Sequence, residues 1–183
     1  MFNFIKTNIE GLYIVEPQVF GDDRGYFFES YKKSDFDNNG LVYEFVQDNQ
    51  SKSKKGVLRG LHYQKRHPQA KLVRVLDGEV FDVAVDLRKG SPTYGKWFGT
   101  ILSEKNKKMM LIPRGFAHGF LVLSDVAVFL YKCDEIYHPE DEEGIIWDDP
   151  TIAVKWPLTD NLILSEKDKT NKTFQELKTE FVL

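Results

Sequence analysis

Hydrophobic positions along the chain fall into short runs of β-branched and aromatic residues, separated by turn residues such as Asp-Gly and Ser-Asp. Runs of this length and composition are typical of strands. The pattern predicts strands over residues 12–16, 25–31, 43–47, 57–63, 71–76, 79–87, 97–102, 107–112, 119–123 and 126–132. Evenly spaced strands without long helices between them indicate a mainly β protein, a jelly-roll sandwich or barrel.

One of these runs, residues 79–87, shows the clearest alternation. Apolar residues at 81, 83 and 85 alternate with Asp82 and Asp86. A period of two is expected for a strand that packs one face on a core and turns the other toward water. We therefore expect Asp82 and Asp86 to lie on a wetter face.

Helices play a small part in the predicted fold. Capping and breaker residues favour two short peripheral helices, over residues 33–39 and 170–178. No repeat, low-complexity tract or linker interrupts the pattern, so residues 1–183 are expected to form a single domain.

Composition and charge exclude several classes of protein. Hydrophobic residues make up 42% of the chain and charged residues 29%, which is typical of a globular protein. A net charge of -3 argues against a nucleic-acid binder, and the basic segment 51–56 is expected to be a solvated loop. The single Cys133 is expected to be a packing residue in a reducing compartment. The sequence has neither a signal-peptide pattern nor a membrane-spanning run, which favours a cytoplasmic protein.

The stretch GVLRGLHYQ, residues 56–64, carries Arg59, His62 and Gln64 among apolar neighbours. Buried polar groups without partners cost free energy, so this strand either has a solvated face or lines a site. Arg59 and His62 would point to opposite faces of a regular strand, but a bulge at Gly60 would bring them to one side. Other polar residues within or beside strands are Arg24, Glu29, Gln47, Asn49, Lys71, His118 and Tyr131. Each alone also fits a structural role, whereas together they indicate a pocket with both signs of charge.

The stretch PRGFAHGF resembles the second motif of the cupin jelly rolls, many of which bind a metal. The first cupin motif needs a His-x-His pair, and here the corresponding stretch reads LHYQ, with Gln64 in place of the second histidine. A metal site needs convergent His or carboxylate ligands. The sequence therefore predicts a protein without a metal.

Several long motifs identify a family. FGDDRGYFFES, FVQDNQSKSKKGVLRGLHYQ, KLVRVLDGEVFDVAVDLR, IPRGFAHGF, FLYKCDEIYHPEDEEGIIWDDP and LSEKD, in this order over about residues 5–168, resemble the dTDP-4-dehydrorhamnose 3,5-epimerase family. The resemblance implies a homodimeric jelly roll that needs no metal or cofactor. It also implies conversion of dTDP-4-dehydro-6-deoxy-D-glucose to dTDP-4-dehydro-L-rhamnose, a precursor of surface polysaccharide.

The resemblance also implies a role for individual residues. His62 corresponds to the catalytic base, Tyr131 to the acid, and Asp168 to the carboxylate that orients His62. Lys71 and Arg59 are expected near the sugar oxygens, with Lys71 stabilising the enolate, and Tyr137 is expected to stack on the thymine. The residues expected to hold the nucleotide and diphosphate are Arg24, Glu29, Gln47, Asp48, Asn49, His118, Glu142 and Lys167.

The chain departs from the family pattern at a few positions. Ala70 stands where glycine is common, and His67 is an additional histidine. The segment PEDEEG varies in length within the family, so that Glu143 competes with Glu142 for its role.

These residue types suit proton transfer next to a ketone. The hydrogens at C3 and C5 are acidic because both carbons flank the C4 carbonyl. A histidine is a free base near neutral pH, and a buried aspartate stabilises the imidazolium that forms.

Three alternatives stay open at this point. An epimerase acting at only one of C3 and C5 would share nearly all these residues. A catalytically silent sugar-nucleotide-binding module is disfavoured by the joint presence of His62, Tyr131 and Asp168, and a metal-dependent cupin oxygenase is disfavoured by Gln64.

Overall fold

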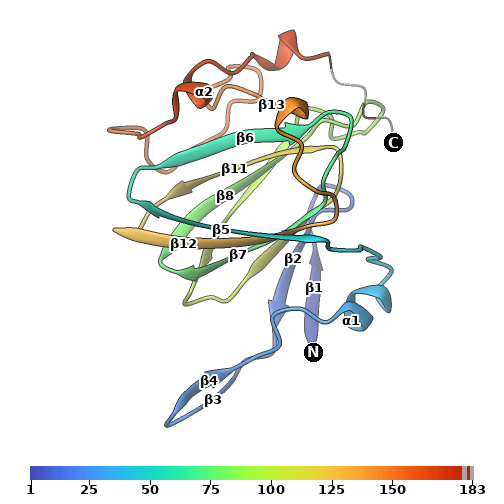
Figure 1. Cartoon of the computed structure of the whole chain (residues 1–183), viewed down its shortest axis with the longest axis vertical. Coiled ribbons are helices and arrows are strands. Elements are labelled where there is room, and N and C mark those ends of the chain that lie inside the picture. Colours follow the sequence, from blue (N-terminus) through green and yellow to red (C-terminus); the bar gives the residue numbers. More distant parts are fainter. Residues whose placement is uncertain (179–180, 182–183) are drawn as a thin grey trace.

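Two antiparallel sheets face each other in the computed structural model, which describes residues 1–178 and 181 (Figure 1). The six-stranded sheet has the order β1 (Phe2–Lys6), β2 (Tyr13–Pro17), β10 (Met109–Ile112), β7 (Lys71–Asp77), β12 (Val126–Cys133) and β5 (Gln47–Lys54). The five-stranded sheet has the order β13 (Glu142–Gly144), β6 (Leu58–Gln64), β11 (Phe116–Val122), β8 (Glu79–Asp86) and β9 (Trp97–Ser103). This architecture confirms the predicted jelly roll.

The remaining elements are short and peripheral. A separate hairpin of β3 (Phe20–Asp22) and β4 (Gly25–Phe27) projects from the sandwich (Figure 1). The helical elements are α1 (Lys33–Asp37), η1 (Pro139–Asp141), α2 (Glu166–Lys169) and η2 (Phe174–Glu176). None of the helices in the described part of the chain is long and apolar enough to cross a membrane.

Apolar residues are buried on both faces of the five-stranded sheet. Between the sheets, Val80 and Phe120 of this sheet belong to one cluster with Phe129 of the six-stranded sheet. On the outer face, Val83 packs in a second cluster with Trp156 of the C-terminal segment, which lies along this side of the sandwich (Figure 1). Burial of apolar surface on both faces is the main stabilising contribution to such a fold.

The C-terminal segment also brings α2 next to β6. A bridge joins Val57 to Ile163, and the Leu58 N–H donates to the Ile163 carbonyl at 3.1 Å. Because Asp168 follows within one short helix, this pairing fixes its side chain beside the centre of β6.

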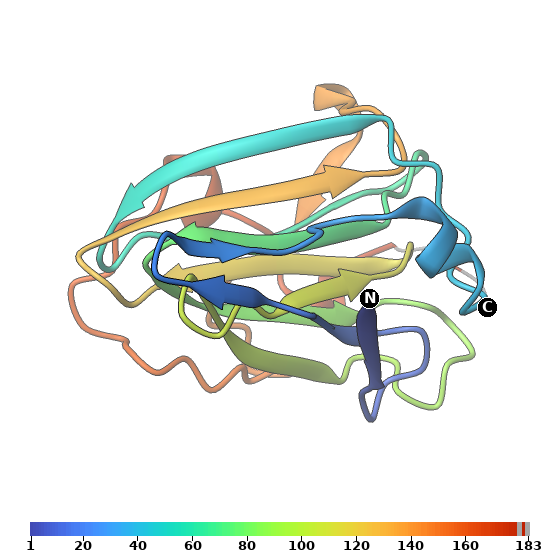
Figure 2. The ribbon, with the colours of Figure 1, turned by 90° about the horizontal axis from the view of Figure 1, so that it is seen from below.

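Several predicted boundaries were wrong. The strand predicted over 43–47 lies instead over Gln47–Lys54, so most of the expected loop at 51–56 is a strand. β5 forms an edge of the six-stranded sheet, which Figure 2 shows from below, and alternate residues of it are exposed. Lysines on an edge strand discourage pairing with other chains, and this explains why the segment resembles a loop in sequence.

Other differences concern the two ends of the chain. β1 was not predicted, and the strand expected over 25–31 is limited to Gly25–Phe27. The helix expected over 170–178 is reduced to the three-residue η2, while α2 precedes it.

The prediction for the polar face of β8 was also wrong. Asp82 and Asp86 are both fully buried, because the sandwich covers both faces of this strand. Asp86 accepts hydrogen bonds from Arg88 Nε at 2.8 Å and Ser91 Oγ at 2.6 Å. Asp82 contacts His118 inside the sandwich. Cys133, expected to be a packing residue, is buried.

Candidate active site

A cavity of about 690 Å³ opens between the two sheets. Ten of the residues that the sequence suggested for the site line this cavity: Gln47, Asn49, Arg59, His62, Lys71, His118, Tyr131, Tyr137, Glu142 and Asp168. Residues far apart in the sequence thus meet at one place.

The predicted bulge in β6 is present. His62 pairs with His118 on β11, and Arg59 pairs with Phe120, so two residues of β6 oppose Gly119 alone. Gly60 has a φ of +129°, and a Cβ there would lie 2.5 Å from the Gly119 Cα, so only glycine fits. The bulge brings Arg59 and His62 to the same cavity, which confirms the structural reason suggested for Gly60.

His62 and Asp168 form a hydrogen-bonded pair. The His62 Nε2–H donates to Asp168 Oδ1, and the Asp168 carboxylate is almost completely buried. Burial raises the pKa of Asp168, but the hydrogen bond and charge of His62, together with Ser165 and Lys167, outweigh burial and hold this pKa below its usual range. The Ser165 hydroxyl fixes the start of α2 by accepting from the Asp168 N–H at 3.1 Å. The Nδ1 atom of His62 is left to accept a proton.

Tyr131 and Lys71 approach the cavity from the opposite sheet. Tyr131 lies on β12 and Lys71 on β7, while His62 lies on β6 of the five-stranded sheet. Lys71 Nζ is 5.9 Å from the centroid of the Tyr131 ring. Burial raises the pKa of Tyr131 to about 12, so its hydroxyl is protonated at neutral pH. Burial lowers the pKa of Lys71, which the nearby groups Cys133, Glu142 and Asp82 oppose.

Sequence reasoning missed one residue behind the cavity, Asp82 on β8 of the five-stranded sheet, which is buried and contacts the cavity-lining His118. His118 Nε2 lies 3.0 and 3.1 Å from the two carboxylate oxygens of Asp82. Burial raises the pKa of Asp82, and the charges of His118 and Lys71 act in the opposite direction. His118 was assigned from the resemblance to the nucleotide and diphosphate, but it lies directly beside His62.

A second polar group borders the cavity around Glu142. Glu142 Oε2 accepts from the Tyr137 hydroxyl at 2.9 Å and from Lys167 Nζ, while its Oε1 lies 3.9 Å from His62 Nδ1. Burial raises the pKa of Glu142, but the Lys167 hydrogen bond and the His62 charge outweigh it and lower this pKa. Glu143 turns away from the cavity to accept from the Tyr63 hydroxyl at 2.9 Å. Of the two glutamates, Glu142 therefore occupies the site.

Gln47 connects this group to β5. Its Oε1 accepts from the Tyr137 N–H at 2.9 Å, and its Nε2 donates to Asn49 Oδ1 at 2.9 Å. Asp48, between them, points to the other side of the strand and pairs with Lys132 at 2.9 Å. Asp48 does not line the cavity, and Lys167 reaches it only through Glu142.

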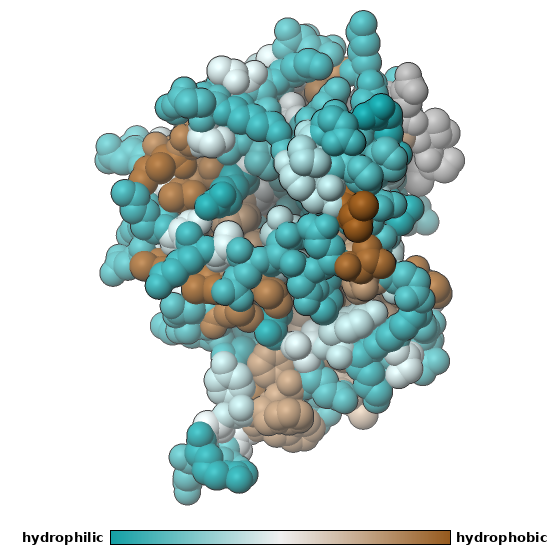
Figure 3. Space-filling view, viewed as in Figure 1, coloured by the Kyte–Doolittle hydropathy of each residue, from teal (hydrophilic) through white to brown (hydrophobic). Residues whose placement is uncertain are grey.

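Arg24 and Glu29 do not line the cavity of their own chain. The Arg24 side chain is 90% exposed on the projecting hairpin, where it pairs with Asp22 at 2.5 Å. Glu29 accepts from the Met1 amino group at 3.2 Å. The tip of the hairpin is covered by hydrophilic side chains (Figure 3). Tyr26 and Phe27 of β4 are exposed.

The residues present do not fit the metal site of a cupin. His62 and His118 are neighbours, but each imidazole is bonded to its own carboxylate. Gln64 uses its amide on backbone groups, donating to the His67 carbonyl at 2.7 Å and accepting from the His138 N–H at 2.7 Å. Over residues 1–178 and 181, no group of three or more histidine, cysteine, aspartate or glutamate side chains is arranged to bind a metal.

Comparisons with known proteins agree with this geometry. A family model described as dTDP-4-dehydrorhamnose 3,5-epimerase matches residues 6–176. A protein of that name from Methanothermobacter thermautotrophicus is 57% identical over 177 residues, which cover 96% of each chain. The crystal structure of an epimerase from Legionella pneumophila in complex with dTDP-4-keto-L-rhamnose is 53% identical, covers 97% of this chain and 95% of its own, and superposes with a TM-score of 0.94.

A third comparison concerns a related activity. The structure of a 3'-monoepimerase from Streptomyces bikiniensis in complex with dTDP-quinovose is 32% identical. It covers 92% of this chain and 86% of its own, with a TM-score of 0.87. On the family model and the 57% identity over nearly the full length, the chain belongs to the dTDP-4-dehydrorhamnose 3,5-epimerase family.

Proposed function

We propose that this protein epimerises C3 and C5 of dTDP-4-dehydro-6-deoxy-D-glucose to give dTDP-4-dehydro-L-rhamnose. The observation that carries the proposal is that His62 and Tyr131 enter one cavity from opposite sheets. Inversion at a carbon needs a base on one face and an acid on the other, and this arrangement supplies both.

In the first step His62 Nδ1 removes the proton from a carbon next to the C4 ketone. The electron pair of the broken C–H bond moves onto the carbonyl oxygen and gives an enolate. Asp168 stabilises the imidazolium that forms, because its carboxylate already accepts from Nε2. Lys71 provides the positive charge for the enolate oxygen, and a preorganised cation of this kind is a large contribution to the rate.

In the second step Tyr131 donates its proton to the opposite face of the same carbon. Its pKa of about 12 keeps the phenol protonated until the electron-rich enolate is next to it. The phenolate then recovers a proton from solvent, and His62 loses one. The reaction neither oxidises nor reduces the sugar, so this sequence of proton transfers consumes no oxidant or reductant.

The proposed ligand contacts follow the polar residues around the cavity entrance. Arg59 provides a positive charge near the sugar oxygens, Gln47 and Asn49 provide amides for the nucleotide and diphosphate, and Tyr137 provides an aromatic face for the thymine. Arg24 and Glu29 require a second copy of the chain, because neither reaches its own cavity. We therefore propose a homodimer in which the exposed aromatic residues of the hairpin pack on the partner.

The homodimer is tested by analytical ultracentrifugation with parallel activity assays. A dimer at micromolar concentration is expected. A fully active folded monomer at that concentration would contradict the proposal.

Activity is also expected to persist after exhaustive chelation of metal ions. If chelation abolished activity and a divalent ion restored it, the metal-free mechanism would be contradicted.

The reaction is tested by incubation with the 4-keto sugar nucleotide in deuterated water, read by NMR. Deuterium at both C3 and C5, with inversion at both centres, is expected. Deuterium and inversion at one centre would identify the second candidate, a single-centre enzyme, like the 3'-monoepimerase that is 32% identical to this chain. Absence of deuterium would instead indicate a binding module.

A further inference from the structure

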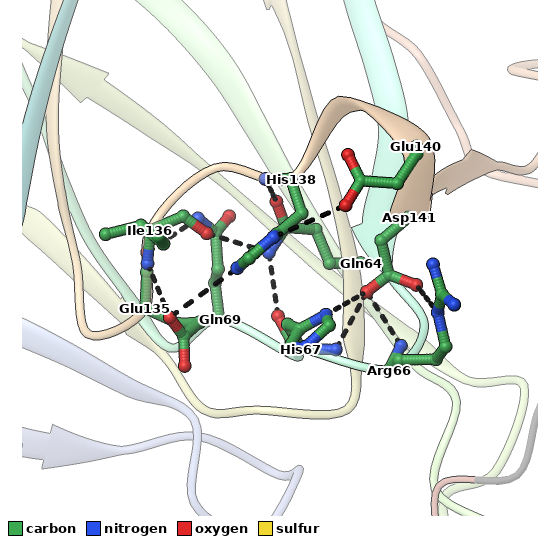
Figure 4. Close-up of polar contacts among 9 residues, drawn as sticks. All are labelled: Gln64, Arg66, His67, Gln69, Glu135, Ile136, His138, Glu140 and Asp141. Carbon is green, nitrogen blue, oxygen red and sulfur yellow. Dashed lines mark hydrogen bonds and ion pairs between the residues drawn. The ribbon is translucent and has the colours of Figure 1, made fainter.

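Two loops beside the cavity are joined by a polar cluster that the proposed reaction does not use (Figure 4). One loop connects β6 to β7, and the other connects β12 to β13 and carries Tyr137. We call the residues that join them the loop lock: Gln64, His67, His138 and Asp141.

Asp141 is the centre of the loop lock. Its side chain is 2% exposed, and Oδ2 accepts from the backbone N–H groups of Arg66 and His67, both at 2.8 Å. Oδ1 accepts from Arg66 Nε at 2.9 Å, and His67 Nδ1 lies 3.1 Å from Oδ2. Burial raises the pKa of Asp141, but these hydrogen bonds outweigh it and lower the pKa to about 2. The carboxylate is thus charged at any physiological pH.

Gln64 and the two histidines connect the loops a second time. The Gln64 amide donates to the carbonyls of His67 at 2.7 Å and Ile136 at 3.1 Å. Its carbonyl oxygen accepts from the His138 N–H at 2.7 Å. The rings of His67 and His138 stack with centroids 4.1 Å apart and planes 19° apart.

The contacts of the loop lock hold the segment around Tyr137 in place. Ile136 before it and His138 after it are both held by Gln64, and the Glu135 carbonyl accepts from Gln69 Nε2 at 2.8 Å. Tyr137 itself is 47% exposed at the cavity entrance. Among the described residues, none of His62, Asp168, Tyr131 and Lys71 is hydrogen-bonded to His67, His138 or Asp141.

We propose that the loop lock holds Tyr137 in its binding position before the nucleotide arrives, with Asp141 as the positioning residue. The inference rests on the proposed contact of Tyr137 with the base of the nucleotide. Ordering a loop on binding costs conformational entropy, so a segment already ordered in the free protein binds its ligand more tightly. Asp141 and His67 lie outside the strands that carry the reacting groups, and neither is hydrogen-bonded to His62, Asp168, Tyr131 or Lys71 in the described residues. Loss of the loop lock is therefore expected to weaken nucleotide binding and to leave kcat nearly unchanged.

The first test uses Asp141→Asn and His67→Ala, with Glu140→Gln as the matched control. Glu140 belongs to the same turn, its side chain is 65% exposed, and within the described part of the chain its ion pair is to His138 Nδ1, at 3.5 Å. Hydrogen exchange of the free protein is expected to rise over residues 134–138 in Asp141→Asn and His67→Ala, and to be unchanged in Glu140→Gln. Because His67 is partly exposed, its variant reports on the loop lock even where Asp141→Asn fails to fold.

The second test measures dTDP binding by calorimetry and epimerisation by steady-state kinetics. Asp141→Asn is expected to weaken dTDP binding on the order of tenfold and to raise KM similarly, with kcat within about twofold. Unchanged affinity, or a loss confined to kcat, would overturn the proposal. Unchanged exchange over residues 134–138 would overturn it as well.

A double-mutant cycle separates this inference from the function on which it rests. Tyr137→Ala alone is expected to weaken dTDP binding, and Asp141→Asn is expected to add little in that background. Full additivity would show that Asp141 acts through another group and would overturn the loop lock. Unchanged dTDP affinity in Tyr137→Ala would instead refute the proposed role of Tyr137 in nucleotide binding.

Discussion

Two histidines lie side by side in the cavity, and they obtain their carboxylate partners from different parts of the molecule. His62 on β6 pairs with Asp168 of α2, in the segment that covers the sheet. His118 on β11 pairs with Asp82 of β8, the neighbouring strand in the same sheet. The His62 side chain is 25% exposed, whereas that of His118 is 8% exposed.

The different origin of the two carboxylates indicates that His62 is a reacting group and His118 a supporting group. A carboxylate supplied from outside the sheet holds one nitrogen of His62 and leaves the other toward the cavity. A carboxylate supplied from within the sheet holds His118 as part of a buried wall that also places a negative charge near Lys71. We infer that His62 exchanges protons with the substrate and that the His118–Asp82 pair fixes the electrostatics around it.

The largest expected effect comes from His62→Asn. Epimerisation and solvent deuterium uptake should both fall by about 10³-fold or more, because no enolate forms without the base. His118→Asn is the matched comparison and should retain uptake within about tenfold of the unaltered protein. Equal loss in the two variants, measured by NMR in deuterated water, would mean that the two histidines do not differ in role.

Asp168→Asn should have the next largest effect. Asparagine can still hold the ring but provides no charge for the imidazolium, so epimerisation and deuterium uptake should fall together by about 10²-fold. Both rates are measured in the same NMR experiment. A fall in inversion alone would place Asp168 in the second proton transfer instead of behind the base.

Asp82→Asn should affect stability more than chemistry. It weakens a buried hydrogen bond to His118, which costs about 2 kcal/mol of the free energy of unfolding. Asp86→Asn is the control, since Asp86 is equally buried but bonds Arg88 and Ser91 away from the cavity. Urea unfolding should show similar losses in both variants, with a several-fold fall in kcat for Asp82→Asn alone. A loss of activity as large as that of His62→Asn would contradict the supporting role.

The smallest expected effect is in the pH dependence of stability. The pKa of Asp168 is below its ordinary value of 3.8 in the folded protein, so its stabilisation is present above that value and is lost as the pH falls. The pKa of Asp82 is raised by burial, so the folded state binds its proton more readily and loses relative stability as the pH rises above 3.8. Unfolding free energies of Asp168→Asn and Asp82→Asn against the unaltered protein, from about pH 3 to pH 6, should therefore change in opposite directions. Parallel changes would contradict these opposite pKa shifts.

Strands with a buried face were predictable from the sequence, and so was the family. β8 and β12 stand out because their apolar residues are numerous, and the bulge at Gly60 follows from the parity of Arg59 and His62. β5 was misplaced because an edge strand facing solvent carries the same lysines and serines as a loop.

The buried carboxylate behind His118 was less predictable. Alternation in β8 marks Asp82 as polar, but a buried polar contact and open solvent produce the same pattern in a single strand. Only the structure reveals the partner of Asp82, because the pairing of β8 with β11 puts His118 and Asp82 on adjacent strands. The pairing of Asp168 with His62 spans 106 residues, and it was expected only because of the family resemblance.

The most direct test of the account is Tyr131→Phe in deuterated water. His62 and Tyr131 approach the sugar from opposite sheets, so removal of the hydroxyl should leave deprotonation by His62 intact. The enolate should then be quenched from the side that it came from, giving residual deuterium uptake with little inversion. Loss of deuterium uptake as complete as in His62→Asn would show that Tyr131 is needed to form the enolate. That result would contradict the assignment of the base to His62 on one sheet and of the acid to Tyr131 on the other.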